Sequence, residues 1–214
     1  MNIGGLGNQT HQDKFNQEKD NIMSSSLKPL NKQTEKEKTE ILNYNKEQYK
    51  LWKSEKESAM RYEIHFRTDD LFNILPVIIY ANGAREKRES FYYCGYVGVP
   101  QGHSLFGADY DNWNYGSGLY APGGLTFSAR HSLIPGYWFL GFDCAHGNDF
   151  TMESDKDDTY GKRKFHTKAD VLNDCLDLMI QISKHEEDFK KKAYIKSYQA
   201  KNKASTLIPK ETVE

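Results

Sequence analysis

Hydrophobic positions concentrate between about residues 62 and 187, and polar segments flank them on both sides. Residues 1–35 offer almost nothing to bury, which predicts disorder. Residues 36–61 are rich in helix formers and carry a thin apolar stripe, which predicts a polar helix lying on the domain by that stripe. The alternative of a partner-binding arm stays open. Residues 188–214 are rich in lysine, and we expect a fraying tail.

The central segment carries the pattern of a small sheet. Residues 62–83 predict two strands joined by a short turn, and residues 91–100 predict a third strand closed by proline. Residues 124–131 and 137–146 flank an Ile-Pro-Gly turn signal and predict a β-hairpin. The sheet is therefore expected to be antiparallel.

A final helix is indicated after residue 166. Thr167 with Asp170 three residues later forms a capping box. Apolar residues then follow at helical spacing, namely Val171, Cys175, Leu178, Met179 and Ile182. The predicted fold class is α+β: a small antiparallel sheet with a C-terminal amphipathic helix packed on it, preceded by an N-terminal helical or disordered extension.

Composition narrows the function classes. The 29 basic and 30 acidic side chains give a net charge of -1, which provides no general attraction to nucleic acid or membrane. Three widely spaced cysteines without a CxxC motif argue against a disulfide framework or a structural zinc site. The longest apolar run, residues 74–81, is far too short to span a bilayer, and no signal peptide is evident. We expect a soluble cytoplasmic protein, with a homo-oligomer left open.

The hairpin register determines which polar groups meet. A loop of two or four residues around Pro135 and Gly136 would place Ser128 opposite Asp143, with Thr126 and Arg130 as diagonal neighbours. This register separates polar from apolar residues on both strands, whereas an odd loop length would destroy it.

Two histidines and a second carboxylate extend this polar face. His146 and Asp149 follow in the loop just beyond the strand, and His103 would complete the cluster if its loop folds over the face. Such a set could hold a metal or perform acid–base chemistry. Structural alternatives stay open: an Asp143–Arg130 ion pair, a structural His146 and a turn residue at Asp149.

Other reactive residues have less promising positions. Cys144 falls on the apolar face and is expected in the core. Four further histidines have no partner at useful spacing, namely His65, His131, His166 and His185.

Three segments resemble a family of small phage and prophage proteins of largely unassigned function: GYVGVPQGHSLFGADYD, GGLTFS and YWFLGFDCAHGND. The family pattern runs GYV-x-V-P-x-GHP-x-YG, HGGLT-[FY]-S and W-x-GFD-x-AH-x-x-D, followed by an amphipathic helix. The resemblance covers roughly residues 92–182. It implies as site residues His103, Gly123, Gly124, Thr126, Ser128, Asp143, His146 and Asp149. Pro122 stands where the pattern has histidine, so the resemblance implies either binding without turnover or a substitute in His131 or His103.

The leading hypothesis is a phage-type accessory protein that binds, and in its stronger form cleaves, a small nucleotide ligand in the host cytoplasm, in a host-takeover or anti-defence role. Aromatic residues of the central segment would stack on a base, and glycine-loop amides would lie near phosphates. The candidate catalytic residues are Asp143, His146 and His103. The candidate ligand-binding residues are Gly102, Tyr110, Gly123, Gly124, Thr126, Ser128, Arg130 and Asp149. Two alternatives remain: a metal-dependent or acid–base hydrolase of another substrate, and a non-catalytic interaction module.

Overall fold

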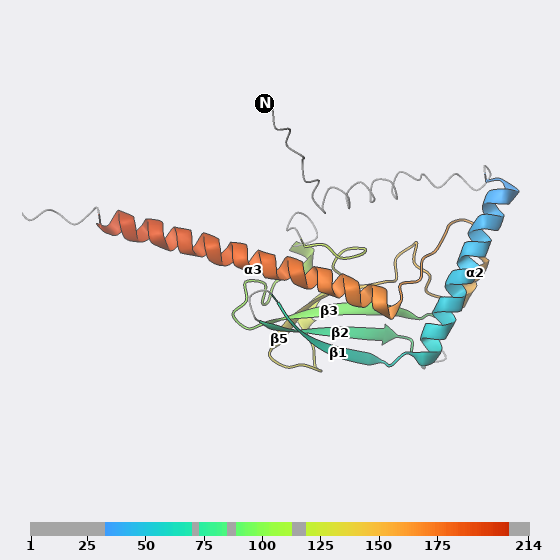
Figure 1. Ribbon diagram of the computed structural model, residues 1–214, viewed down its shortest axis with the longest axis horizontal. Coiled ribbons are helices and arrows are strands. Elements are labelled where there is room, and N and C mark those ends of the chain that lie inside the picture. Colours follow the sequence, from blue (N-terminus) through green and yellow to red (C-terminus); the bar gives the residue numbers. More distant parts are fainter. Residues whose placement is uncertain (1–32, 70–72, 85–88, 113–118, 206–214) are drawn as a thin grey trace, which may run out of the picture.

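A computed structural model describes residues 33–69, 73–84, 89–112 and 119–205 (Figure 1). It contains a five-stranded antiparallel sheet in the order β1-β2-β3-β5-β4 and two long helices, which confirms the α+β class. The predicted disorder of residues 1–35 lies outside the described residues as far as residue 32. For residues 33–35 it is wrong, because Thr34 caps α2 and Glu35 is the first residue of that helix. The elements are α2 (Glu35–Ser58), β1 (Tyr62–Thr68), β2 (Ile74–Asn82), β3 (Tyr92–Pro100), η2 (Tyr110–Asn112), β4 (Phe127–Arg130), β5 (Tyr137–Asp143), η3 (Glu153–Asp157) and α3 (Lys168–Ser205).

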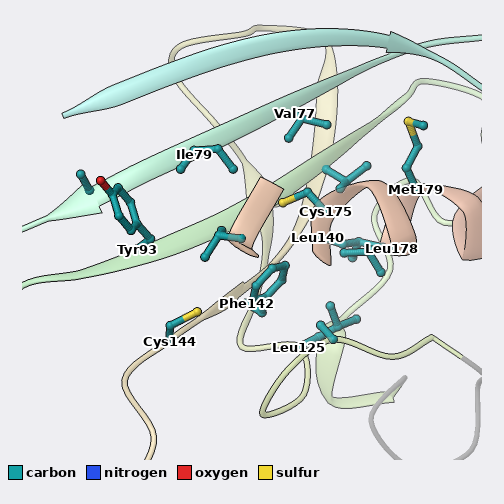
Figure 2. Close-up of a cluster of buried hydrophobic side chains, with 14 of the residues drawn as sticks. Val77, Ile79, Tyr93, Leu125, Leu140, Phe142, Cys144, Cys175, Leu178 and Met179 are labelled. Carbon is teal, nitrogen blue, oxygen red and sulfur yellow. The ribbon is translucent and has the colours of Figure 1, made fainter. Parts of the chain in front are cut away.

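Helix α3 covers one face of the sheet, which we call the inner face (Figure 1). The capping box predicted at its start is present, since Thr167 N–H donates to Asp170 Oδ2 at 2.9 Å and Asp170 N–H donates to Thr167 Oγ1 at 3.2 Å. The approach is close at Gly95, where an added Cβ would lie 2.5 Å from Cys175 Sγ. Figure 2 shows the resulting core, in which Cys175 and Leu178 of the helix face Leu140 and Phe142 of β5.

The first half of α3 is the packed half. The helix continues to Ser205 and does not fray beyond residue 187 as expected. Residues 188–205 contain neither glycine nor proline and are rich in lysine and alanine, which favour helix. The described side chains after Glu187 are exposed, so this half projects past the sheet (Figure 1). No helix in the described ranges combines the length and apolar character needed to cross a membrane.

Helix α2 stands at one end of the sheet and is anchored by its predicted stripe (Figure 1). Trp52, 4% exposed, packs on Phe91 and Phe150 and donates its indole N–H to the carbonyls of Phe91 and Thr151. Two turns earlier, the fully buried Asn45 donates to two backbone carbonyls and accepts from Arg163 N–H. Helix α2 therefore stabilises the segment that connects η3 with α3.

The hairpin of β4 and β5 forms as predicted, but its predicted register is wrong. Ser128 lies opposite Leu140, and Arg130 pairs with Trp138. The intervening loop has an odd number of residues. Asp143 therefore points to one face of the sheet, whereas Ser128 and Arg130 point to the other. The alternation could not fix the register because β5 is apolar on both faces: Phe139 is 0% and Phe142 1% exposed.

The outer face of the sheet carries aromatic side chains. Tyr62 stacks on Tyr80 with ring centroids 4.9 Å apart, and Tyr96 meets Phe127 at 5.0 Å. His131, at the start of the β4–β5 loop, contacts Tyr62 and Tyr96 with its ring. Both faces of the central strands are therefore largely apolar.

Candidate functional site

The loop after β5 places His146 against Asp149. Asp149 Oδ2 accepts a hydrogen bond from the backbone N–H of His146 at 2.8 Å and lies 3.2 Å from its Nδ1. The turn is also closed by the backbone, since Asp149 N–H donates to the His146 carbonyl at 2.9 Å, and aspartate side chains commonly bond backbone groups three residues before them. The carboxylate thereby fixes both the backbone and the ring of His146.

The second oxygen of the same carboxylate holds another histidine. Asp149 Oδ1 lies 3.1 Å from Nε2 of His166, which directly precedes the capping box of α3. The two segments run side by side: Phe150 N–H donates to the Lys164 carbonyl, and Lys164 N–H donates to the Asn148 carbonyl. One carboxylate therefore orients two imidazoles, and we call His146, Asp149 and His166 the His–Asp–His cluster.

Residues of α2 stabilise the two segments that carry the His–Asp–His cluster. Arg163 donates to the Gly147 carbonyl and to Asp158, while its own N–H is held by Asn45. Gln48, one turn further along α2, accepts from Phe165 N–H at 2.9 Å. Hydrogen bonds thus hold the backbone on either side of the cluster, and those to Asn45, Gln48 and Asp158 are half-buried.

The glycine turn before β4 forms one wall of the cluster. Gly123 has φ of +70° and Gly124 has φ of +91°, and the ring of His146 lies so close that a Cβ on Gly123 would be 2.2 Å from its Nε2. Pro122 directly precedes this contact.

The first turns of α3 complete the surroundings. Asp174 is half-buried, and burial raises its pKa, with His166 and Lys164 acting in the opposite direction. Burial also raises the pKa of Tyr120, and the Asp174 carboxylate adds to this effect. Tyr120 is held by Gln181, which accepts from its N–H and donates to its carbonyl. Tyr120 thus lies against α3, within electrostatic reach of Asp174.

The charge state of Asp149 follows from its partners. Burial raises its pKa, but hydrogen bonds from His166 and His146 outweigh burial and hold the pKa below its ordinary value. Asp149 is therefore ionised at neutral pH and can stabilise a protonated imidazole. The side chain of His146 is 36% exposed, against 15% for His166, so His146 is the more accessible of the two bases.

Asp143 lies apart from this cluster. It sits opposite Cys94 on the outer face, and its Oδ1 accepts from Ala145 N–H at 3.1 Å. Its carboxylate helps to raise the pKa of Tyr92 and Cys94, although burial is the main cause for both. The expected Asp143–Arg130 pair is not formed, because the register separates them and Arg130 lies over the Phe106 ring.

His103 lies at the other end of the sheet. It follows the end of β3, whereas Asp143 pairs with the beginning of that strand, so a distance of about 20 Å separates the two ends. Its Nδ1 accepts from Leu105 N–H and lies 3.7 Å from Glu186 of α3. Gly102 precedes it, and Tyr110 donates its N–H to Ser128 Oγ in the same region. These residues do not join the histidine cluster.

The remaining candidates divide in the same way. Gly123 lies against the His146 ring and Gly124 follows it in the same turn, whereas Thr126 is exposed and donates its N–H to the Gly141 carbonyl. His131, offered as a substitute for the missing histidine, lies on the outer face. The second histidine beside His146 and Asp149 is His166.

Sequence reasoning set His166 aside because it lies seventeen residues from Asp149. The pairing depends on the contact between residues 148–150 and Lys164, which leaves no periodic signal in the sequence. Its position directly before a capping box was the one signal available, since side chains there lie at the helix N-terminus.

The three cysteines are buried, which disfavours their thiolate form. Cys144 is 3% exposed in the core, as expected, and burial raises its pKa. Burial also raises the pKa of Cys94 to about 12. Within the described residues, no group of three or more His, Cys, Asp or Glu side chains is arranged to hold a metal ion.

Comparisons with models of protein families, with curated proteins and with solved structures found no match.

Proposed function

We propose that the His–Asp–His cluster binds a small nucleotide-like ligand and cleaves it by acid–base catalysis. The observation that carries this proposal is the single ionised carboxylate of Asp149 hydrogen-bonded to two imidazoles. A carboxylate in this position fixes the tautomer of a catalytic histidine and stabilises its protonated form.

His146 is the proposed base. Because its Nδ1 faces Asp149, Nδ1 carries the proton in the neutral ring and Nε2 has a free lone pair. Nε2 would take a proton from an attacking water or hydroxyl, and the resulting imidazolium would return it to the leaving oxygen. His166 acts as a positioning residue, since its Nε2 faces the second oxygen of Asp149.

The nucleotide-like character of the ligand rests on three neighbouring features. Tyr120 is 36% exposed and offers a ring for stacking. Gly123 and Gly124, in consecutive left-handed conformations, allow a phosphate to approach the backbone closely. The N-terminus of α3 favours negative charge. The phage setting, with a role in the host cytoplasm, is supported by the resemblance of residues 92–182.

A panel of mono-, di- and cyclic nucleotides tests the proposal by thermal shift and calorimetry, followed by chromatography of the products. We expect at least one nucleotide to raise the melting temperature and to be cleaved by the wild type. His146→Gln should remove cleavage while retaining binding, and Asp143→Asn should retain both. If no nucleotide binds but another ester is hydrolysed with the same dependence on His146, the chain is a hydrolase of that substrate.

A second candidate function is a protein-interaction module. Beyond residue 192, the described side chains of α3 include three exposed large hydrophobic ones, namely Tyr194 at 70%, Ile195 at 45% and Tyr198 at 57%. Lysines surround them, and such exposed aromatic patches are typical of binding surfaces. A chain ending at residue 192 would lose partner capture but keep nucleotide binding and cleavage, which separates the two functions.

A further inference from the structure

Strand β1 leaves one edge of the sheet open. It pairs with β2 along all seven of its residues, and no described strand pairs with its other side. Sheet edges in soluble proteins are usually protected by charged side chains, proline, a bulge or a very short strand. The segment Tyr62–Thr68 has no proline, its register with β2 runs without interruption, and its charged side chains are Glu63 and Arg67. This edge therefore opposes pairing with most strands and is open to one whose charges complement Glu63 and Arg67.

The hydrogen-bonding groups at this edge can be assigned. Ala81 N–H donates to the Arg61 carbonyl, and these two residues are opposite each other in the extended register. In an antiparallel ladder such pairs alternate, so residues 63, 65 and 67 bond toward β2. The N–H and C=O groups of residues 62, 64, 66 and 68 consequently point to the open edge.

The side chains at this edge are apolar on the outer face. Ile64 is 42% exposed and Phe66 is 57% exposed. On the inner face, Glu63 and Arg67 lie symmetrically on either side of His65. Glu63 is held by Lys168, the first residue of α3, with 2.8 Å between Nζ and Oε1. The strand thus carries opposite charges at equal distances from its central residue.

This pattern is self-complementary. When two copies of β1 pair antiparallel about His65, Glu63 lies opposite the partner's Arg67, and Ile64 lies opposite the partner's Phe66. The second pair also has the outward-pointing backbone groups that the new ladder requires. Each charge pair and each apolar pair occurs twice, because a two-fold axis relates the copies.

The neighbouring registers are unfavourable. A shift that centres the pairing on Ile64 places Arg61 opposite the partner's Arg67. A shift the other way, to Phe66, places Glu63 opposite the partner's Asp69. Like charges directly opposite each other destabilise a sheet. These three registers all pair outward-pointing backbone groups with each other. Of the three, only the register centred on His65 places opposite charges across from each other.

We propose that β1 pairs antiparallel with β1 of a second copy of this chain, joining two five-stranded sheets into one. The two-fold axis passes between the His65 residues, perpendicular to the sheet, so both α3 helices lie on the same face of the dimer. The partner's Arg67 extends the Glu63–Lys168 contact at the start of α3. The dimer interface thus contacts Lys168, which lies two residues after His166. The proposed pairing does not depend on the proposed chemistry.

Charge reversal at Arg67 tests the pairing in the full-length chain. Arg67 is exposed, and its side chain donates to the neighbouring carbonyl of Phe66. The variant Arg67→Glu places two carboxylates opposite each other twice, so we expect the dimer dissociation constant to rise by about tenfold or more. Sedimentation equilibrium over a dilution series measures this constant.

A compensating variant reverses the other charges. Glu63→Arg combined with Arg67→Glu restores opposite pairs, and Lys168→Glu keeps the contact of residue 63 with α3. We expect this triple variant to dimerise as the wild type does. Lys184→Glu, on the exposed side of α3, is the control for net charge and should leave the dissociation constant unchanged.

A second variant tests the backbone. Ile64→Pro removes an N–H that points to the open edge and leaves the bonds to β2 in place, so the variant should fold and be monomeric. Circular dichroism and a thermal melt verify its folding. A wild type that stays monomeric throughout the dilution series overturns the proposal. A dimer that is unaffected by both Arg67→Glu and Ile64→Pro also overturns it, by assigning the interface to another surface.

Discussion

Asp149 and His166 are seventeen residues apart in the chain, yet Oδ1 of Asp149 lies 3.1 Å from Nε2 of His166. The contact joins the loop after β5 to the start of α3, and the carboxylate holds His146 with its other oxygen. Because the hydrogen bonds lower the pKa of Asp149, the carboxylate is stabilised in its charged form.

Replacing Asp149 by Asn should therefore destabilise the protein, by about 1–3 kcal/mol, because a charged acceptor of two imidazoles is lost. Urea unfolding of Asp149→Asn, His166→Asn and the double variant measures the coupling between the two residues. We expect a coupling energy of about 0.5–3 kcal/mol, as for residues in direct contact. Additive effects of the two single changes would contradict the contact.

The close approach of Gly123 to His146 leads to a second prediction. Gly123→Ala introduces a Cβ at a positive φ and in steric conflict with the imidazole ring. Gly136→Ala is a matched control, because Gly136 has a similar φ of +88° but open space around its Cβ position. The backbone conformation should cost each variant about 1–2 kcal/mol. Thermal and urea unfolding should show a larger loss for Gly123→Ala, together with loss of ligand binding. Equal losses would mean that the ring moves away freely.

Much of the fold could be predicted from the sequence because its signals are local. The Thr167–Asp170 capping box, the strand ending at Pro100 and the stripe of α2 that contains Trp52 each depend on residues a few positions apart. The hairpin register could not be predicted, because Phe139 and Phe142 are both buried, on opposite faces of β5. Alternation then carries no information about which face meets α3.

The candidate site was predictable only in its local half. His146 and Asp149 are three residues apart and were recognised together. His103 was grouped with them through its motif, but the length of β3 separates it from them. His166 and Asp174 join the site through the packing of α3, which no spacing in the sequence encodes.

The corrected position of Asp143 gives a third prediction. Asp143→Asn should leave ligand binding and cleavage unchanged, because the side chain lies opposite Cys94 and outside the histidine cluster. Its stability should change by less than about 1 kcal/mol, because the asparagine carbonyl can still accept from Ala145 N–H. Calorimetric titration with the best nucleotide of the panel measures the first effect. Loss of binding without loss of stability would return Asp143 to the site.

The buried His103 gives a prediction about pH. Burial lowers its pKa, with Glu186 acting in the opposite direction and His185 and Lys190 adding to the lowering. In the unfolded chain its pKa is about 6.5, so the unfolded state takes up the proton first as the pH falls. The free energy of unfolding should therefore fall from about pH 6.5 downward, until the folded state is protonated as well.

Two variants separate the histidines that titrate in this range, since burial also lowers the pKa of His131. His103→Asn and His131→Asn should each flatten the decline in unfolding free energy between about pH 6.5 and 5. The carboxylates with lowered pKa, Asp149 and Glu186, lose their stabilising contribution only below about pH 4.5, so the two ranges do not overlap. Urea unfolding at a series of pH values measures the slopes. A His103→Asn variant with the slope of the wild type would show that His103 takes up its proton equally in the folded and unfolded states.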